Sequence, residues 1–185
     1  RHIYAQVIDD ERGVTIAYCD SPGPLEGPSQ RTFYAVAPLP AAWTPVQKRS
    51  FLREYNRVSI EDLSIYEAMP GHHVQIAKAN RYPSKLRALL ASGSFIEGWA
   101  VYAERLMVDA GYRKDDPRMR LVQLKWYLRT ITNALMDQQI HAGTMTEAEA
   151  MRLLTEQGFQ EEREAAGKWR RAVVTATQLS TYFVG

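Results

Sequence analysis

Apolar residues recur at helical spacing from Thr44 to the end of the chain, and this pattern restricts the fold to a mainly α-helical one. The clearest case begins at Pro117, a residue suited to the first turn of a helix, and runs to Gly143, which is placed to end it. We expect one long helix there, with these residues on its core face: Leu121, Leu124, Leu128, Ile131, Leu135 and Ile140.

Capping signals and helix breakers predict the other helices. Thr44 followed by Pro45 starts a first helix that reaches about Asn56. Three further starts show the spacing of a capping box: Ser59 with Asp62, Ser94 with Glu97, and Thr146 with Glu149. Pro70-Gly71 interrupts the helix that begins near Ser59, and Gly158 ends the one that begins near Thr146. In the charged stretch 160–171, Glu164 and Lys168 have the i,i+4 spacing of a solvated helix face.

The first 43 residues differ from the rest because they are rich in turn formers. Ser21-Pro22-Gly23-Pro24 and Gly27-Pro28 separate β-prone stretches at 14–18 and 32–36, which predicts irregular structure with a hairpin. We therefore expect a single mainly α domain over 1–185, in which an irregular, β-containing segment 1–43 precedes a helical region 44–185.

Size and composition limit the class of protein. With 185 residues and 45% hydrophobic content the chain can bury one sizeable core. The 23 basic and 21 acidic residues nearly cancel, so no nucleic-acid partner is expected. Cys19, the single cysteine, excludes an internal disulfide framework and a cysteine-based zinc finger. No apolar run approaches the roughly 20 residues of a membrane span.

The N-terminus suggests a longer parent protein. It shows neither an initiating methionine nor the layout of a signal peptide. We expect the chain to be the C-terminal part of something longer and soluble. Its location, bacterial cytoplasm or export, is left open.

Chemically suggestive residues flank the predicted helix break. Residues 66–73 read Tyr-Glu-Ala-Met-Pro-Gly-His-His, which places a carboxylate and two imidazoles there. In H-E-x-x-H, two histidines one helical turn apart bind zinc while the glutamate acts as general base. Here Tyr66 stands at the first histidine position and the spacing is longer. The segment is either an altered zinc motif or a surface Glu67 beside the loop histidines His72 and His73.

Other candidate residues also allow two interpretations. Glu97 is a metal ligand or closes the capping box with Ser94. Glu104, seven residues later on the same helix face, is an acceptor for a ligating imidazole or a solvated carboxylate. Asp137 orients His141 four residues away for anion stabilisation, or the two form a surface pair.

Four segments in this order resemble the bacterial family called domain of unknown function 885 (DUF885). They are 66–75 (YEAMPGHHVQ), 95–104 (FIEGWAVYAE), 137–141 (DQQIH) and 181–185 (TYFVG). The resemblance covers about residues 32–185. Family members are usually longer and are similar to the gluzincin peptidases, including the carboxypeptidase Taq type. The resemblance therefore implies a helical, zincin-like domain and a metallopeptidase-like hydrolase that cleaves peptides or small amides.

The resemblance also implies roles for individual residues. Glu67 would be the general base, while His72 and Glu97 would bind zinc, with His73 as second choice for a ligand. His141 or Tyr182 would stabilise the oxyanion, although an aromatic between Leu179 and Phe183 is commonly core.

Tyr66 is the departure from the family pattern, which has histidine there. Tyrosine ligates zinc as a phenolate, from a resting pKa of about 10. Three explanations stay open: Tyr66 is a phenolate ligand; His73 or a segment outside the chain replaces the imidazole; or the protein is a non-catalytic pseudoenzyme or helical binding domain. An N-terminal segment or partner that completes the cleft is a further alternative.

Overall fold

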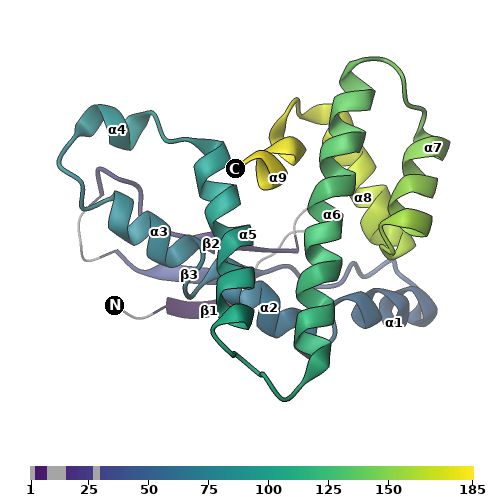
Figure 1. The fold of residues 1–185 in the computed structure, drawn as a ribbon, viewed down its shortest axis with the longest axis horizontal. Helices are drawn as coiled ribbons and strands as arrows, with labels where there is room; N and C mark the ends of the chain where they lie inside the picture. The colour runs from purple at the N-terminus through teal and green to yellow at the C-terminus, as the bar shows by residue number, and fades with distance from the viewer. Residues whose placement is uncertain (1–2, 8–15, 27–29) are drawn as a thin grey trace.

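The computed structural model describes residues 3–7, 16–26 and 30–185, which are mainly helical with short strands near the N-terminus, as the sequence predicts (Figure 1). The strands are β1 (Ile3–Val7), β2 (Ala17–Asp20) and β3 (Thr32–Val36). The helices are α1 (Pro45–Glu54), α2 (Arg57–Glu67), α3 (His72–Ala79), α4 (Lys85–Leu89), α5 (Gly93–Asp109), α6 (Pro117–His141), α7 (Glu147–Arg152), α8 (Glu162–Val174) and α9 (Thr181–Val184). A π-helical turn, η1 (Leu153–Gln157), continues α7, and a 3₁₀ turn, η2 (Gln178–Ser180), precedes α9.

The strands form one small sheet in the order β1-β3-β2. β2 and β3 are antiparallel, with Ala17 opposite Val36 and Asp20 opposite Phe33, which confirms the expected hairpin pairing for the described residues. Residues 14 and 15 of the predicted first strand lie outside them. β1 adds to the other edge of β3 in parallel. β2 contacts α2, so the sheet supports the helical region from one side.

Two predicted helix starts are wrong, and both errors have the same cause. α2 begins before Ser59, because Asn56 caps it. The side-chain oxygen Oδ1 of Asn56 accepts hydrogen bonds from the backbone N–H groups of Val58 at 3.0 Å and Ser59 at 3.3 Å. α5 begins before Ser94, because the Ser92 hydroxyl accepts from the backbone N–H of Phe95, the third residue of the helix, at 3.3 Å. Each free N–H is satisfied by the earlier capping residue. The predicted cap at Thr44 and the predicted capping box of Thr146 with Glu149 are both confirmed.

The predicted core face of α6 is wrong at three of its six residues, although the bounds of the helix agree closely with the prediction. Leu128, Ile131 and Ile140 are partly buried, as a core face requires. Leu121 and Leu124 are 67% and 52% exposed, and Leu135 is exposed as well. The buried face carries polar residues among apolar ones: Met119, Gln123, Trp126, Thr130, Thr132, Asn133, Met136 and Asp137. This face meets α2, α5, η2 and α9, so neighbouring elements decide which side of α6 is buried.

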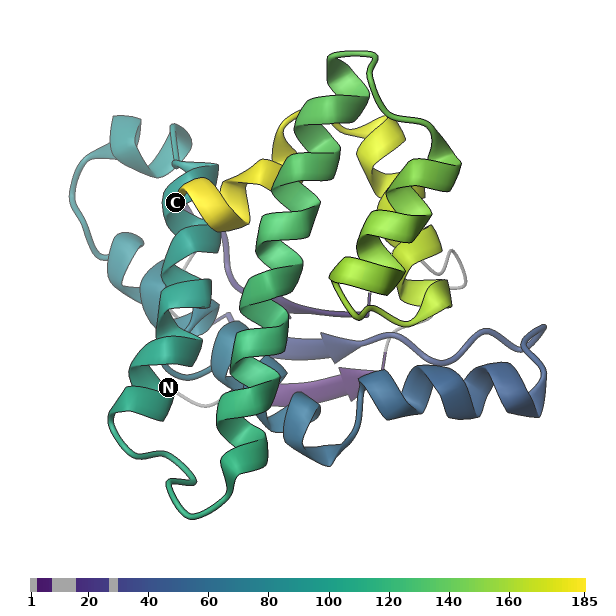
Figure 2. The same ribbon diagram turned by 45° about the vertical axis from the view of Figure 1, so that its right-hand side comes forward.

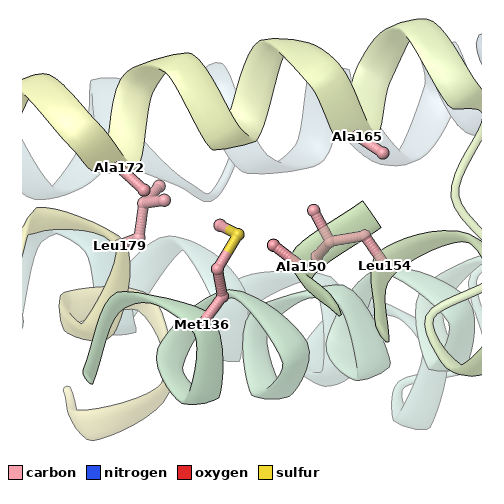
Figure 3. Close-up of a cluster of buried hydrophobic side chains, with 6 residues drawn as sticks. All are labelled: Met136, Ala150, Leu154, Ala165, Ala172 and Leu179. Atoms are coloured by element: carbon pink, nitrogen blue, oxygen red, sulfur yellow. The ribbon is translucent and has the colours of Figure 1, made fainter. Parts of the chain in front are cut away.

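α5 and α6 form the centre of the helical region (Figures 1 and 2). α3 and α4 lie beside α5, the α7–α8 pair lies beside α6, and α9 bridges α5 and α6. A cluster of buried side chains joins α6, α7, η1, α8 and η2 (Figure 3): Met136, Ala150, Leu154, Ala165, Ala172 and Leu179. Because alanines supply half of this cluster, α8 can approach α6 closely and bring its polar face to the centre of the molecule.

Candidate functional site

A cavity of about 420 Å³ lies where the helices converge. The lining residues fall into two sets, which we call the two walls: the first wall comes from α2, α3 and α5, and the second wall comes from α6, α8 and α9. Residues of β2 also line the cavity. Its polar lining includes Tyr66, Glu67, His72, Glu97, Glu104, Arg129, Asn133, Lys168, Arg171 and Tyr182. A second, more apolar cavity between α3, α4 and α5 shares Ile76 and Ile96 with it.

The predicted break at Pro70-Gly71 is confirmed, and it shapes the first wall. Gly71 has φ −68° and ψ −132°, and a Cβ atom there would lie 1.8 Å from the carbonyl oxygen of Tyr66. The Met69–Pro70 peptide bond is cis. The Trp99 indole N–H donates to the carbonyl oxygen of Pro70 at 3.0 Å, which ties the break to α5. Glu67 thus ends α2 and His72 begins α3 at the same cavity.

Tyr66, His72 and Glu97 meet at the centre of this wall. The Tyr66 hydroxyl donates to Glu97 Oε2, and His72 Nε2 lies 3.4 Å from the same oxygen. Burial raises the pKa of the Glu97 carboxyl, but hydrogen bonds from His72 and Tyr66 outweigh it and the net pKa is lowered. Burial and the negative Glu97 hold the pKa of Tyr66 well above 10. Tyr66 is therefore a neutral phenol beside an ionised carboxylate.

Glu67 has the properties of a buried carboxyl that can exchange a proton near neutrality. Burial is the largest cause and raises its pKa from 4.5 to about 7. The charge of Glu97 acts in the same direction, whereas His72 and the backbone N–H of Cys19 act against it. A general base works best when its pKa lies near the working pH.

Tyr182 presents a hydroxyl group from the second wall. Its oxygen accepts from Gln178 Nε2 at 3.0 Å and from Arg171 Nη2 at 3.3 Å. A phenol oxygen that accepts these bonds keeps its own hydrogen for another acceptor. Burial and the charge of Glu97 raise its pKa, so the group is a proton-bearing donor.

Contacts of the C-terminal segment with α5 and α6 hold the two walls together. A Cβ atom on Gly98 would lie 2.0 Å from the carbonyl carbon of Gly185, so α5 and α9 touch through glycine backbones. Asp137 Oδ2 accepts from the backbone N–H of Ser180 at 2.9 Å and from its hydroxyl at 2.8 Å. These contacts fix the segment that carries Tyr182 over α5.

Not every candidate residue joins the cavity lining. His73 is buried outside it. His141 also lies outside, with Nδ1 2.8 Å from the carbonyl oxygen of Asp137 and 3.3 Å from its Oδ1. Glu104 does line the cavity, where burial and the nearby Asp62 hold its pKa well above the usual value. The structure thus brings Tyr66, Glu67, His72, Glu97, Glu104 and Tyr182 together.

Three cations of the second wall were not predicted as site residues. Arg129, Lys168 and Arg171 line the cavity, and Lys168 pairs with Glu164 at 3.2 Å. Glu164 is 5% exposed, so the prediction of a solvated face for Glu164 and Lys168 is wrong. The sequence does contain one indication of this burial. Glu164 and Lys168 share a helix face with the small residues Ala165 and Ala172, and that face is the buried one.

The residues present fit part of a zinc site. Zinc bonds of roughly 2.0–2.1 Å at tetrahedral angles place two ligand atoms roughly 3.4 Å apart. His72 Nε2 and Glu97 Oε2 lie 3.4 Å apart. Within the described ranges no group of three His, Cys, Asp or Glu side chains is arranged to hold a metal ion. Two zinc ligands are therefore available, and the third ligand would be Tyr66 or a group outside the described residues.

These features define a mainly helical domain around a buried carboxylate, imidazole and phenol cluster. Residues 5–185 match the model of the family described as "Bacterial protein of unknown function (DUF885)", and the chain belongs to this family. No curated protein matches it. Among the helices that the structure describes, none has the length and apolar character to cross a membrane.

Two solved structures have a similar fold. One, a candidate lipoprotein of unknown function from Shewanella oneidensis, is 39% identical with a TM-score of 0.82, over 100% of this chain and 32% of that protein. The other, a candidate lipoprotein from Colwellia psychrerythraea, is 21% identical with a TM-score of 0.83, over 99% of this chain and 30% of that protein. The chain therefore spans about a third of the length of either protein.

Proposed function

We propose that this chain carries the centre of a zinc-dependent, gluzincin-like peptidase that hydrolyses amide bonds in peptides. The observation that carries the proposal is the convergence of His72 and Glu97 at the spacing of two zinc ligands, beside Glu67. The DUF885 resemblance of the same residues supports it. The chain spans about a third of the length of the two similar proteins, so the activity is proposed for a whole protein of which this chain would be one part.

Each residue has a chemical task in this proposal. His72 Nε2 and Glu97 Oε2 would hold the zinc ion, which when bound polarises a carbonyl and lowers the pKa of a coordinated water. Glu67, with a pKa of about 7, accepts the proton of the attacking water. Tyr182 donates its free hydroxyl hydrogen to the oxyanion that develops on the substrate carbonyl.

A second candidate function is favoured by one contact. The Tyr66 hydroxyl donates a hydrogen bond to Glu97 Oε2, so the carboxylate oxygen that would otherwise bind metal already has a partner. In this alternative the family fold is kept as a non-catalytic binding domain, with Tyr66 closing the former metal position. The two functions differ in the metal content that they predict.

The deciding experiment measures zinc per chain by plasma mass spectrometry after purification without chelators. Wild type should hold close to one zinc ion, and Glu97→Ala should lose it. Glu156→Ala is the matched control, because Glu156 is exposed on η1. Negligible zinc in wild type would favour the non-catalytic domain.

Glu67→Gln tests the catalytic role separately from metal binding. The variant keeps the shape of the side chain but cannot accept the proton, so peptide hydrolysis should fall by roughly 10²–10⁴-fold while zinc content stays unchanged. Turnover of a peptide mixture, followed by mass spectrometry, measures this. Undiminished hydrolysis would eliminate Glu67 as the base.

Tyr66→His distinguishes an impaired site from a lost one. The substitution replaces a neutral phenol with an imidazole at the position where the family has histidine, so zinc affinity should rise at least about tenfold. Zinc titration against a competing chelator gives the affinity. No increase would indicate that the loss of the metal site goes beyond Tyr66.

A further inference from the structure

The two walls of the cavity carry opposite charge. Glu67, Glu97 and Glu104 come from α2 and α5, whereas the second wall presents three cations: Arg129, Lys168 and Arg171. Glu164 is the carboxylate that α8 places among these cations. Among the described residues of α6 and α8 that form hydrogen bonds or ion pairs with these cations, Glu164 is thus one carboxylate beside three positive groups.

Arg129 is the best compensated of the three. Its guanidinium stacks over Trp126 at 4.8 Å and bonds through Nη1 to Glu164 Oε1 and to the Tyr55 hydroxyl, each at 3.2 Å. It also interacts electrostatically with Glu104 and Asp62. Arg129 is thus held in place by protein groups, and we assign it a structural role.

Lys168 has to share its partner. Its Nζ lies 3.2 Å from Glu164 Oε1, the oxygen that Arg129 also contacts. Burial lowers the pKa of Lys168 from 10.5 to about 8, and the positive charges of Arg129 and Arg171 add to this effect, while Glu164 opposes it. An additional anion would therefore stabilise the charged form.

Arg171 is the least compensated. Within the described part of the chain, its guanidinium meets the neutral hydroxyl of Tyr182 at 3.3 Å rather than a carboxylate. The side chain is half-buried, and its charge helps to lower the pKa of Glu97 at the proposed centre. A partly desolvated guanidinium next to a cavity favours a planar anion, because its donors match a carboxylate in geometry.

A neutral side chain of the second wall, Asn133, also contributes to the cavity. Asn133 is buried on α6 and lines the cavity. Its side-chain oxygen accepts no hydrogen bond within the described residues. A buried acceptor of this kind is costly unless a ligand or water donates to it, and a backbone N–H of a peptide would do so.

We propose that Arg171 and Lys168 bind the free C-terminal α-carboxylate of a peptide, with the last amide groups of that peptide placed beside Asn133. The proposal rests on the proposed peptidase function and adds its substrate class. One carboxylate suits this site better than a phosphate dianion, because Glu97 and Glu67 on the first wall repel a second negative charge. The reacting amide then lies near the C-terminal end of the substrate.

The test measures binding rather than turnover. The full chain carrying Glu67→Gln is titrated in chelator, by calorimetry, with N-acetylated tetraalanine as the free acid, with the same peptide as its C-terminal amide, and with inorganic phosphate. We expect the free acid to bind at least about tenfold more tightly than the amide. Arg171→Gln should abolish this preference, Arg171→Lys should restore part of it, and Arg170→Gln should leave it unchanged, since Arg170 is exposed on the same helix.

Several results would overturn the proposal. One is equal affinity for the free acid and the amide, or binding of neither peptide. Another is tighter binding of phosphate than of the free acid. The last is a preference for the free acid that survives both Arg171→Gln and Lys168→Met. Thermal unfolding of each variant confirms that it is folded. Because the titration uses neither metal nor hydrolysis, its failure is distinct from failure of the proposed function, which zinc content decides.

Discussion

The two walls of the cavity contrast in how their residues are arranged along the chain. In the first wall, Tyr66, Glu67 and His72 come from one short segment, and Glu97 comes from another. In the second wall, Arg129, Lys168 and Arg171 are spread over two helices and have no motif in common. The first wall is organised by a local backbone break, whereas the second is assembled by packing α8 onto α6.

This difference suggests different sources of stability. The first wall also contains the ionised Glu97, but its backbone break is held by small contacts such as the hydrogen bond from Trp99 to Pro70. The second depends on charges that have been taken out of water and are costly when a partner is removed. Substitutions should therefore have their largest effects in the second wall and at the joint between the walls.

Arg129→Met should have the largest effect. It leaves the buried Glu164 with Lys168 alone and should lower the free energy of unfolding by about 3–5 kcal/mol. Urea denaturation measures this. Arg120→Met on the same helix is the control, since Arg120 is 47% exposed and its ion pair with Asp109 should contribute about 1 kcal/mol or less. Similar losses in both variants would contradict a buried charge network in the second wall.

Gly98→Ala tests the joint between the walls. The new methyl group would overlap the backbone of Gly185 and displace α9, with an expected loss of about 3 kcal/mol in unfolding free energy. Gly93→Ala is the matched control, because a Cβ atom there meets no atom within 4 Å. The control should be neutral or slightly stabilising, since alanine favours helix. Equal behaviour of the two variants would refute close packing at Gly98.

Asp62→Asn addresses a buried acid behind the first wall and depends on pH. Burial raises the pKa of Asp62 from 3.8 to about 7, although Arg129 opposes this, and Asp62 in turn raises the pKa of Glu104. The unfolded chain ionises Asp62 more readily, so its stabilising contribution is complete below about pH 4 and is lost as the pH rises toward about 7. Asp62→Asn should therefore raise the free energy of unfolding by roughly 1–2 kcal/mol at pH 8 and change it little at pH 4.

Urea denaturation of this variant at both pH values provides the measurement. The exposed Asp115→Asn serves as the matched control. A loss of stability at pH 8 would show that the ionised form of Asp62 is the one that the fold prefers.

Trp99→Phe should have the smallest effect. It removes the indole donor to Pro70 but keeps an aromatic ring in place, so the loss should be about 1 kcal/mol. Thermal unfolding, with zinc content as a second measurement, sharpens the comparison. A loss as large as that of Arg129→Met would contradict the view that the first wall depends on small local contacts.

The sequence by itself determined the features that depend on neighbouring residues. The mainly helical class, the hairpin pairing of β2 with β3, the caps at Thr44 and Thr146, and the break at Pro70-Gly71 follow from local backbone chemistry. The four motifs also identified the DUF885 family. Such features are encoded within a few residues, because caps and breaks depend on nearby N–H groups and allowed dihedral angles.

Only the tertiary structure decided which faces are buried and which charges meet. It turned Leu121 and Leu124 outward and placed polar residues of α6 inside, and it brought Glu164 and Lys168 out of solvent. It also freed Glu97 from its predicted capping role by placing the helix start at Ser92, and set it between Tyr66 and His72. Helical spacing shows which residues share a face, but burial is decided by the elements that pack against that face from far along the chain.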